Sequence, residues 1–84
     1  KDKEIRENIL YSTNLFLTFL ENNNHWKSGY NHNQLRITRI IECLRLLVSD
    51  EDAHHFYTKV ISLIDNRNKI NKMTYKYWKD ALSL

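Results

Sequence analysis

Residues 33–48 read NQLRITRIIECLRLLV, and this stretch decides the fold. Its isoleucine, leucine and valine side chains recur at the i, i+3, i+4, i+7 spacing of one face of an α-helix. They are Ile37, Ile40, Ile41, Leu44, Leu47 and Val48. Leu35 and Leu46 add apolar surface beside that face, so we expect a central helix buried against neighbours on two sides. Asn33 is expected to cap its start.

Three further helices are predicted around the central one. The first, over residues 2–21, has an apolar face at helical spacing. That face consists of Ile5, Ile9, Phe16, Phe19 and Leu20. The third, over residues 50–65, follows Ser49, an N-cap hydroxyl with three carboxylates after it. Its expected buried residues are Ala53, Phe56, Tyr57, Val60, Ile61 and Ile64. The last helix, over residues 74–83, is expected to begin at a capping Thr74. Its apolar face consists of Tyr75, Trp78, Ala81 and Leu82.

The composition favours an all-α protein. The chain has 84 residues, of which 42% are hydrophobic, with one glycine and no proline. Sheets and barrels usually need more turn residues than that, whereas helices need few. We therefore expect residues 1–84 to form a single domain, a small orthogonal or antiparallel bundle of four helices. The short link at 48–50 makes the second and third helices antiparallel neighbours.

The residues that could carry out chemistry do not form a recognisable site. The histidines are His25, His32, His54 and His55, and none has the spacing of a chelating pair. The single cysteine, Cys43, lies mid-helix, where a small buried hydrophobe fits, and excludes an intramolecular disulfide. There is no glycine-rich phosphate loop and no nucleophile motif around a serine. No apolar run approaches the roughly 18 residues of a membrane-spanning helix. We expect no enzyme activity, no metal and no cofactor.

The start of the central helix is the first candidate binding surface. Arg36 and Arg39 lie one turn apart on its polar face, beside the aromatic side chains of the loop 21–32. Arginine with aromatic residues is a combination enriched at protein interfaces. Two alternatives remain open for these arginines: contact with a partner, or an ion pair with a carboxylate of a neighbouring helix. The sequence predicts a peptide- or protein-binding surface made of Trp26, Tyr30, His32, Arg36 and Arg39.

The helix start itself also allows two interpretations. Free backbone N–H groups and the partial positive charge there can be satisfied by local capping by Asn33, with His32 bonded across the loop toward the first helix. Alternatively, they can hold an anion, with Arg36 one turn in. The aromatic residues Trp26 and Tyr30 are expected to order the preceding loop by packing back on the core.

A second candidate surface is the basic segment 67–79. It contains Arg67, Lys69, Lys72, Lys76 and Lys79, with no acidic residue among them. Tyr75, Tyr77 and Trp78 are interleaved with these charges, a composition typical of nucleic-acid-binding surfaces. The alternative is that Tyr75 and Trp78 belong to the core and the lysines form a solvated face.

The run LRITRII at residues 35–41 resembles the central segment of the opioid growth factor receptor conserved region. NHN at 31–33 precedes it and LRLL at 44–47 follows it, as in that family. Residues 5–26 are similar to the preceding helix and its tryptophan-bearing loop, and YWKDA at 77–81 resembles the ending of bacterial-type members. Residues that match the next helix are Ala53, Phe56 and Tyr57. The resemblance thus covers nearly the whole chain in the right order.

Two features depart from the family pattern. Nothing matches the upstream Ile-Gln-Trp-Leu-Phe-Pro-like run, and Val48-Ser49 replaces the usual glycine after the central helix. The resemblance therefore implies a bacterial-type or diverged member and a fragment of a longer region. It implies peptide binding without assigned catalytic residues, in the cytoplasm if the protein is bacterial and in the nucleus if it is eukaryotic.

Three functions follow as hypotheses. The first is a non-enzymatic helical interaction module that binds a peptide or protein partner. The second is a nucleic-acid-binding domain that uses the segment 67–79. The third is that residues outside this chain complete a catalytic cleft.

Overall fold

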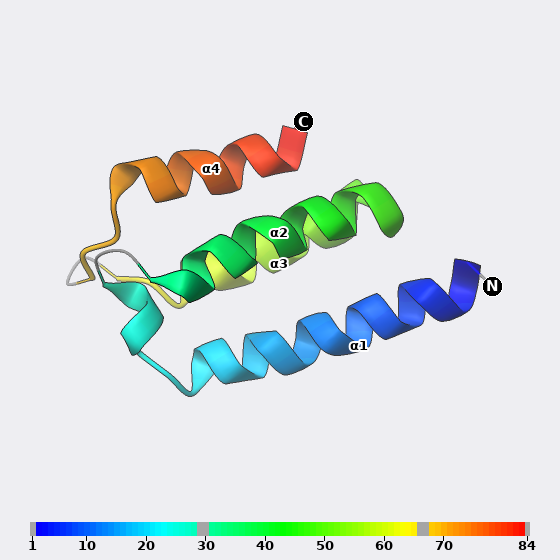
Figure 1. Ribbon diagram of the computed structural model, residues 1–84, viewed down its shortest axis with the longest axis horizontal. Coiled ribbons are helices and arrows are strands. Elements are labelled where there is room, and N and C mark those ends of the chain that lie inside the picture. The colour runs from blue at the N-terminus through cyan, green and yellow to red at the C-terminus, as the bar shows by residue number, and fades with distance from the viewer. Residues whose placement is uncertain (1, 29–30, 66–67, 84) are drawn as a thin grey trace.

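The computed structural model describes residues 2–28, 31–65 and 68–83. It contains four α-helices and one short 3-10 helix (Figure 1). The α-helices are α1 (Asp2–Glu21), α2 (His32–Leu47), α3 (Asp50–Ser62) and α4 (Lys72–Ser83), and the 3-10 helix is η1 (His25–Lys27). The predicted all-α bundle is confirmed.

Helix α2 lies at the centre of the bundle. It packs most extensively against α3 and α4, and it also contacts α1 and η1. Figure 1 shows α1 and α4 on opposite sides of α2, with α3 behind it. Helix α1 runs antiparallel to α2, and so does α3, as the short link between α2 and α3 predicted. The prediction that the central helix is covered on at least two sides is therefore confirmed.

The core draws on every helix. Its buried apolar residues are Phe16, Leu20, Trp26, Ile37, Ile41, Leu44, Ala53, Phe56, Val60, Ile70, Trp78 and Ala81. Most of these lie on the faces that the sequence periodicity predicts, because a helix buries the stripe that recurs every 3.6 residues. Tyr57, Ile61, Ile64, Tyr75 and Leu82 are only partly buried and pack around this core.

A buried polar residue, Gln34, joins three elements of the core. Its side chain is only 2% exposed, and its Nε2 donates a hydrogen bond to the Trp26 carbonyl at 2.8 Å. The hydroxyl of Thr74 donates to Gln34 Oε1 at 3.2 Å, and the indole N–H of Trp78 donates to the Gln34 carbonyl at 3.0 Å. These bonds fasten η1 and α4 to the first turn of α2, since buried polar groups are costly to leave unpaired.

Trp26 also closes the end of α1. Its indole N–H donates to the carbonyls of Leu20 and Asn23, at 3.0 and 2.8 Å. The last carbonyls of a helix have no partner within the helix, so the indole N–H supplies a hydrogen-bond donor at the end of α1. The prediction that Trp26 packs back on the core is confirmed, because its side chain is completely buried.

Two predicted helix starts are wrong by a few residues. Asn31, not Asn33, caps α2: its backbone is extended and its side chain accepts a hydrogen bond from the Asn33 N–H at 2.9 Å. Helix α4 starts at Lys72 rather than at a capping Thr74, since the hydroxyl of Thr74 is bonded to Gln34 instead. Ser49 is the N-cap of α3 as predicted, and α3 ends at Ser62, earlier than residue 65.

Several apolar residues predicted to be buried are exposed. They are Ile5, Phe19, Leu35, Leu46 and Leu47. Ile5 and Leu47, exposed by 50% and 55%, line a hollow between the start of α1 and the end of α2. Phe19 stacks on Phe16 with 6.0 Å between ring centroids and remains at the surface. Helix α1 contacts α2 less extensively than α3 and α4 do, and the hollow lies along that contact.

Candidate functional site

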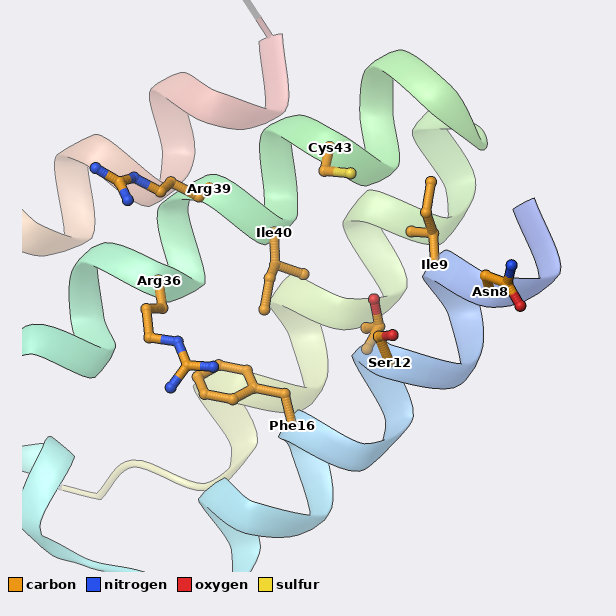
Figure 2. A pocket seen from close by; sticks show the side chains of 9 residues that line it. Asn8, Ile9, Ser12, Phe16, Arg36, Arg39, Ile40 and Cys43 are labelled. Carbon is orange, nitrogen blue, oxygen red and sulfur yellow. The ribbon is translucent and has the colours of Figure 1, made fainter. Parts of the chain in front are cut away.

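A groove runs between α1 and α2 and has a volume of about 490 Å³ (Figure 2). From α1 it is lined by Asn8, Ile9, Ser12, Thr13 and Phe16, and from α2 by Arg36, Arg39, Ile40 and Cys43. We call this set the α1–α2 groove. It contains apolar, neutral polar and cationic side chains, and no carboxylate is among them.

The groove exists because of the small residues on one side of α1. Asn8 and Ser12 are exposed and lie one turn apart, beside the line of large residues that faces the core. Their short side chains leave space that a leucine or phenylalanine would fill. Ile9 and Ile40 are partly buried beneath that space and form an apolar floor.

The antiparallel arrangement of the two helices sets the order of residues along the groove. Arg36 lies over the ring of Phe16 at one end, with 4.6 Å from the guanidinium carbon to the ring centroid. Ile9 and Cys43 lie farther along, as Figure 2 shows. A second hollow continues the seam, lined by Ile5, Arg6, Leu46, Leu47 and Val48. The side chain of Arg6 donates to the Val48 carbonyl there at 3.4 Å.

The two arginines of the groove have no anionic partner among the residues that the structure describes. Arg36 stacks on Phe16 and donates weakly to Asn33 Oδ1 at 3.4 Å. Arg39 is exposed and forms no hydrogen bond or ion pair within the described part of the chain. Among the residues that the structure describes, neither arginine therefore forms the ion pair with a carboxylate of a neighbouring helix that was the alternative to partner contact.

The stack of Arg36 on Phe16 organises the cationic end of the groove. A cation over an aromatic face is attracted by the ring electrons, and the contact restricts the long arginine side chain. A guanidinium held in this way keeps N–H groups available for a carboxylate. Figure 2 shows the Arg36 guanidinium at the Phe16 ring, above the groove wall formed by α1.

A hollow on the other side of α1 has a different character. Its volume is about 230 Å³, and its lining includes Asp52, His55 and Lys59 of α3 together with Leu10 and Leu17 of α1. Both signs of charge are present there, and Asp52 already accepts a hydrogen bond from the Ser49 hydroxyl at 2.6 Å. The α1–α2 groove is the larger of the two and the one without a carboxylate.

The other predicted partner-binding residues are placed differently. Trp26 is completely buried, so its predicted role at a contact surface is wrong: its indole is used in the core. His32 is exposed at the first position of α2, one turn before Arg36, and it does not line the groove. Tyr30 lies outside the described residues. The structure thus brings together only Arg36 and Arg39 of the predicted set.

Residues Asn8, Ser12 and Phe16 are part of the candidate site, and sequence reasoning missed them. The periodicity of α1 identifies which face is apolar, but it does not say which helix that face meets. The small side chains at positions 8 and 12 are the one signal in the sequence, because they interrupt an otherwise bulky surface. Cys43 is half-buried beside them rather than fully enclosed by leucine and isoleucine.

The basic segment forms a separate surface on α4. Lys72, Lys76 and Lys79 are exposed and follow the i, i+4, i+7 spacing of one helix face, and Lys69 is exposed in the preceding connection. Arg67 lies outside the described residues. Of the interleaved aromatic residues, only Tyr77 is well exposed, at 55%.

The other two aromatic residues of that segment are not free to stack on a base. Trp78 is completely buried, and Tyr75 is partly buried and packs edge-to-face on Trp78 at 5.6 Å. Their assignment to the core is thereby confirmed. The ring of Tyr75 also lies near Tyr57. Burial, and then the proximity of Tyr75, raise the pKa of the Tyr57 hydroxyl.

The described residues contain no group of three or more histidine, cysteine, aspartate or glutamate side chains able to hold a metal ion. Within the same part of the chain, no helix has the length and apolar character needed to cross a membrane.

Comparison with known proteins yields no relative. No family model matches the chain, and neither the curated proteins nor the solved structures contain a match. The resemblance to the opioid growth factor receptor conserved region therefore stays a prediction based on the residues quoted above.

Proposed function

We propose that this chain is a non-enzymatic helical interaction module that binds a peptide or protein partner in the α1–α2 groove. One observation carries the proposal: an open, largely apolar groove contains two arginines that lack a carboxylate partner among the described residues. Binding sites are commonly concave and apolar, with a few placed polar groups that orient the ligand. The resemblance to a peptide-binding family points to the same class of function.

Each part of the groove has a role in this proposal. Ile9, Ile40 and the edge of Phe16 provide apolar surface, whose burial drives association. Arg36 and Arg39 provide charge-assisted hydrogen bonds that select and orient the partner. Asn8 and Ser12 provide neutral hydrogen-bonding groups at the opposite wall.

The test is to fill the groove without disturbing the core. Ser12→Trp places a large side chain at an exposed position of the α1 wall. Thr58→Trp is the matched control, because Thr58 is exposed on α3 and lines none of the hollows described above. Peptides selected from a display library on the unmodified chain are measured by fluorescence polarisation on both variants. Circular dichroism verifies that each variant keeps its helices.

We expect Ser12→Trp to abolish peptide binding and Thr58→Trp to leave it unchanged. Amide chemical shifts should change on peptide addition at Ile9 and Ile40. Binding that survives Ser12→Trp, or shifts confined to other elements, contradicts the proposal. A library that yields no binder contradicts it as well.

A second candidate function uses the lysine row of α4. Three exposed lysines, Lys72, Lys76 and Lys79, share one helix face with Tyr77 beside them, an arrangement suited to a phosphate backbone. Only one exposed aromatic residue accompanies them, so this candidate ranks second. It requires affinity for generic DNA or RNA that falls steeply with salt, and an electrophoretic shift assay at low salt without retardation eliminates it.

A further inference from the structure

The geometry points to an acidic amphipathic α-helix as the occupant of the α1–α2 groove. This inference rests on the function proposed above and specifies the chemistry of the partner. Three features of the groove carry it: its helical walls, its length and its charge.

The walls of the groove favour a helix over an extended peptide. Both walls are α-helices, whose backbone N–H and C=O groups are bonded within each helix. An extended peptide in such a groove finds no backbone edge to pair with, so its own backbone groups remain without protein partners. A helix brings its backbone bonds with it and presents only side chains, which match the apolar floor at Ile9 and Ile40.

The length of the groove suits about three helical turns. The α1 wall extends from Ile5, in the second hollow, to Phe16, which is about 16 Å at a rise of about 1.5 Å per residue. Exposed apolar side chains at Ile5 and Leu47 extend the floor to one end, and Phe16 closes the other. A partner with apolar residues at i, i+4 and i+7 places three anchors over about 10.5 Å, which is about two of these three turns.

The charge of the groove selects acidic side chains. Arg36 and Arg39 lie three residues apart on α2, about 4.5 Å along its axis, so two carboxylates one turn apart on a partner helix reach them together. Neither arginine has a carboxylate partner among the described residues. The chain's net charge of +3 adds a weaker attraction for an acidic partner at longer range.

A second copy of this chain is the competing occupant. The exposed side of α1 carries Tyr11 and Leu15, with Glu4 and Glu7 in its first two turns. The exposed Ile5 lies in the same turns as these two carboxylates, and Tyr11 and Leu15 follow them, so α1 of a second copy is an alternative that the sedimentation experiment below decides.

The experiment selects helices from a library and tests whether acid is required. The library consists of peptides of about 16 residues with leucines at i, i+4 and i+7 and randomised flanking positions. It is selected on the full chain. We expect aspartate or glutamate to be enriched at two flanking positions one turn apart. Replacing either acid by its amide should weaken binding by about tenfold.

The protein variants separate local charge from net charge. Arg39→Gln should lower the affinity for the selected acidic peptides by about tenfold. The substitution removes no hydrogen bond or ion pair that the structure shows for Arg39. Lys76→Gln on α4 removes the same charge at a distance and should have no more than a minor effect. The loss from Arg39→Gln should disappear for a peptide whose matching acid has already been replaced, as in a double-mutant cycle.

Each other outcome is informative. Selected helices without acidic enrichment that are still blocked by Ser12→Trp overturn the acidic-helix inference and leave the proposed groove function standing. If Ser12→Trp leaves the affinity of the selected peptides unchanged, both the acidic-helix inference and the proposed groove function are contradicted. A dimer of the chain in sedimentation, dissociated by Ser12→Trp, identifies a second copy as the occupant and overturns the inference.

Discussion

Replacing Gln34 by methionine should destabilise the protein more than any substitution of a surface polar residue. Methionine keeps the length of the side chain but cannot donate to the Trp26 carbonyl or accept from the Thr74 hydroxyl, now at 2.8 and 3.2 Å. A buried group left without its partner costs about 1–3 kcal/mol. The hydrogen bond to the Trp26 carbonyl is buried and the one from Thr74 is partly buried. We therefore expect the free energy of unfolding to fall by about 3 kcal/mol in total.

The assay is thermal and urea unfolding followed by circular dichroism. A loss of about 3 kcal/mol corresponds to a drop of about 15 °C in Tm for a domain of this size. Thr74→Val removes one of the two bonds and should cost about 1 kcal/mol, but close to nothing in the Gln34→Met background. A change of less than about 0.5 kcal/mol in Gln34→Met refutes the role assigned to Gln34, since surface substitutions usually fall within that range.

Three further predictions concern the same framework. Trp26→Phe should lower the free energy of unfolding by about 2 kcal/mol through loss of the indole bonds at the end of α1, and should leave peptide affinity unchanged in fluorescence polarisation. Ser49→Ala should cost about 1 kcal/mol in urea unfolding, because it removes the N-cap of α3; an unchanged midpoint contradicts this. The raised pKa of Tyr57 favours its neutral form, so its contribution to stability is complete below about pH 10 and is lost as pH rises through the raised pKa. Tyr57→Phe should therefore unfold with a shallower pH dependence between about pH 9 and pH 11 than the unmodified chain.

The sequence predicts the helices well where one-dimensional periodicity determines the answer. Ile37, Ile41 and Leu44 are buried as expected, because a single stripe on α2 meets the core whatever its neighbours are. Ser49 is the cap of α3 as expected, since a hydroxyl before three carboxylates is a local signal. These features depend on residues close together in the chain.

Features that depend on tertiary contacts are harder to predict. Nothing in the periodicity of α2 marks Gln34 as buried, yet it is buried because Trp26 and Thr74 bring it partners from distant segments. The sequence predicts the cap of α2 at Asn33 instead of Asn31, since both are asparagines and only the extended backbone at Asn31 distinguishes them.

The candidate site shows the same division. The sequence identifies Arg36 and Arg39 as polar residues on a largely apolar helix, and the structure places both in the α1–α2 groove. The opposite wall, with Ser12 and Phe16, follows from how α1 packs on α2, which periodicity does not encode. For Trp26 the sequence predicts both a place in the core and a role at a contact surface, and the structure buries its side chain completely.

Cys43 provides the most direct measurement of whether the α1–α2 groove binds the selected acidic helix. It is the one cysteine of the chain, it is half-buried, and it lines the groove, so its rate of modification by a thiol reagent reports access to that groove. The control is Ser62→Cys in a Cys43→Ser background, which places the thiol at an exposed position of α3. We expect saturating peptide to slow modification of Cys43 severalfold and to leave the control thiol unaffected. An unchanged rate at Cys43, with peptide binding verified in the same sample, contradicts the central claim.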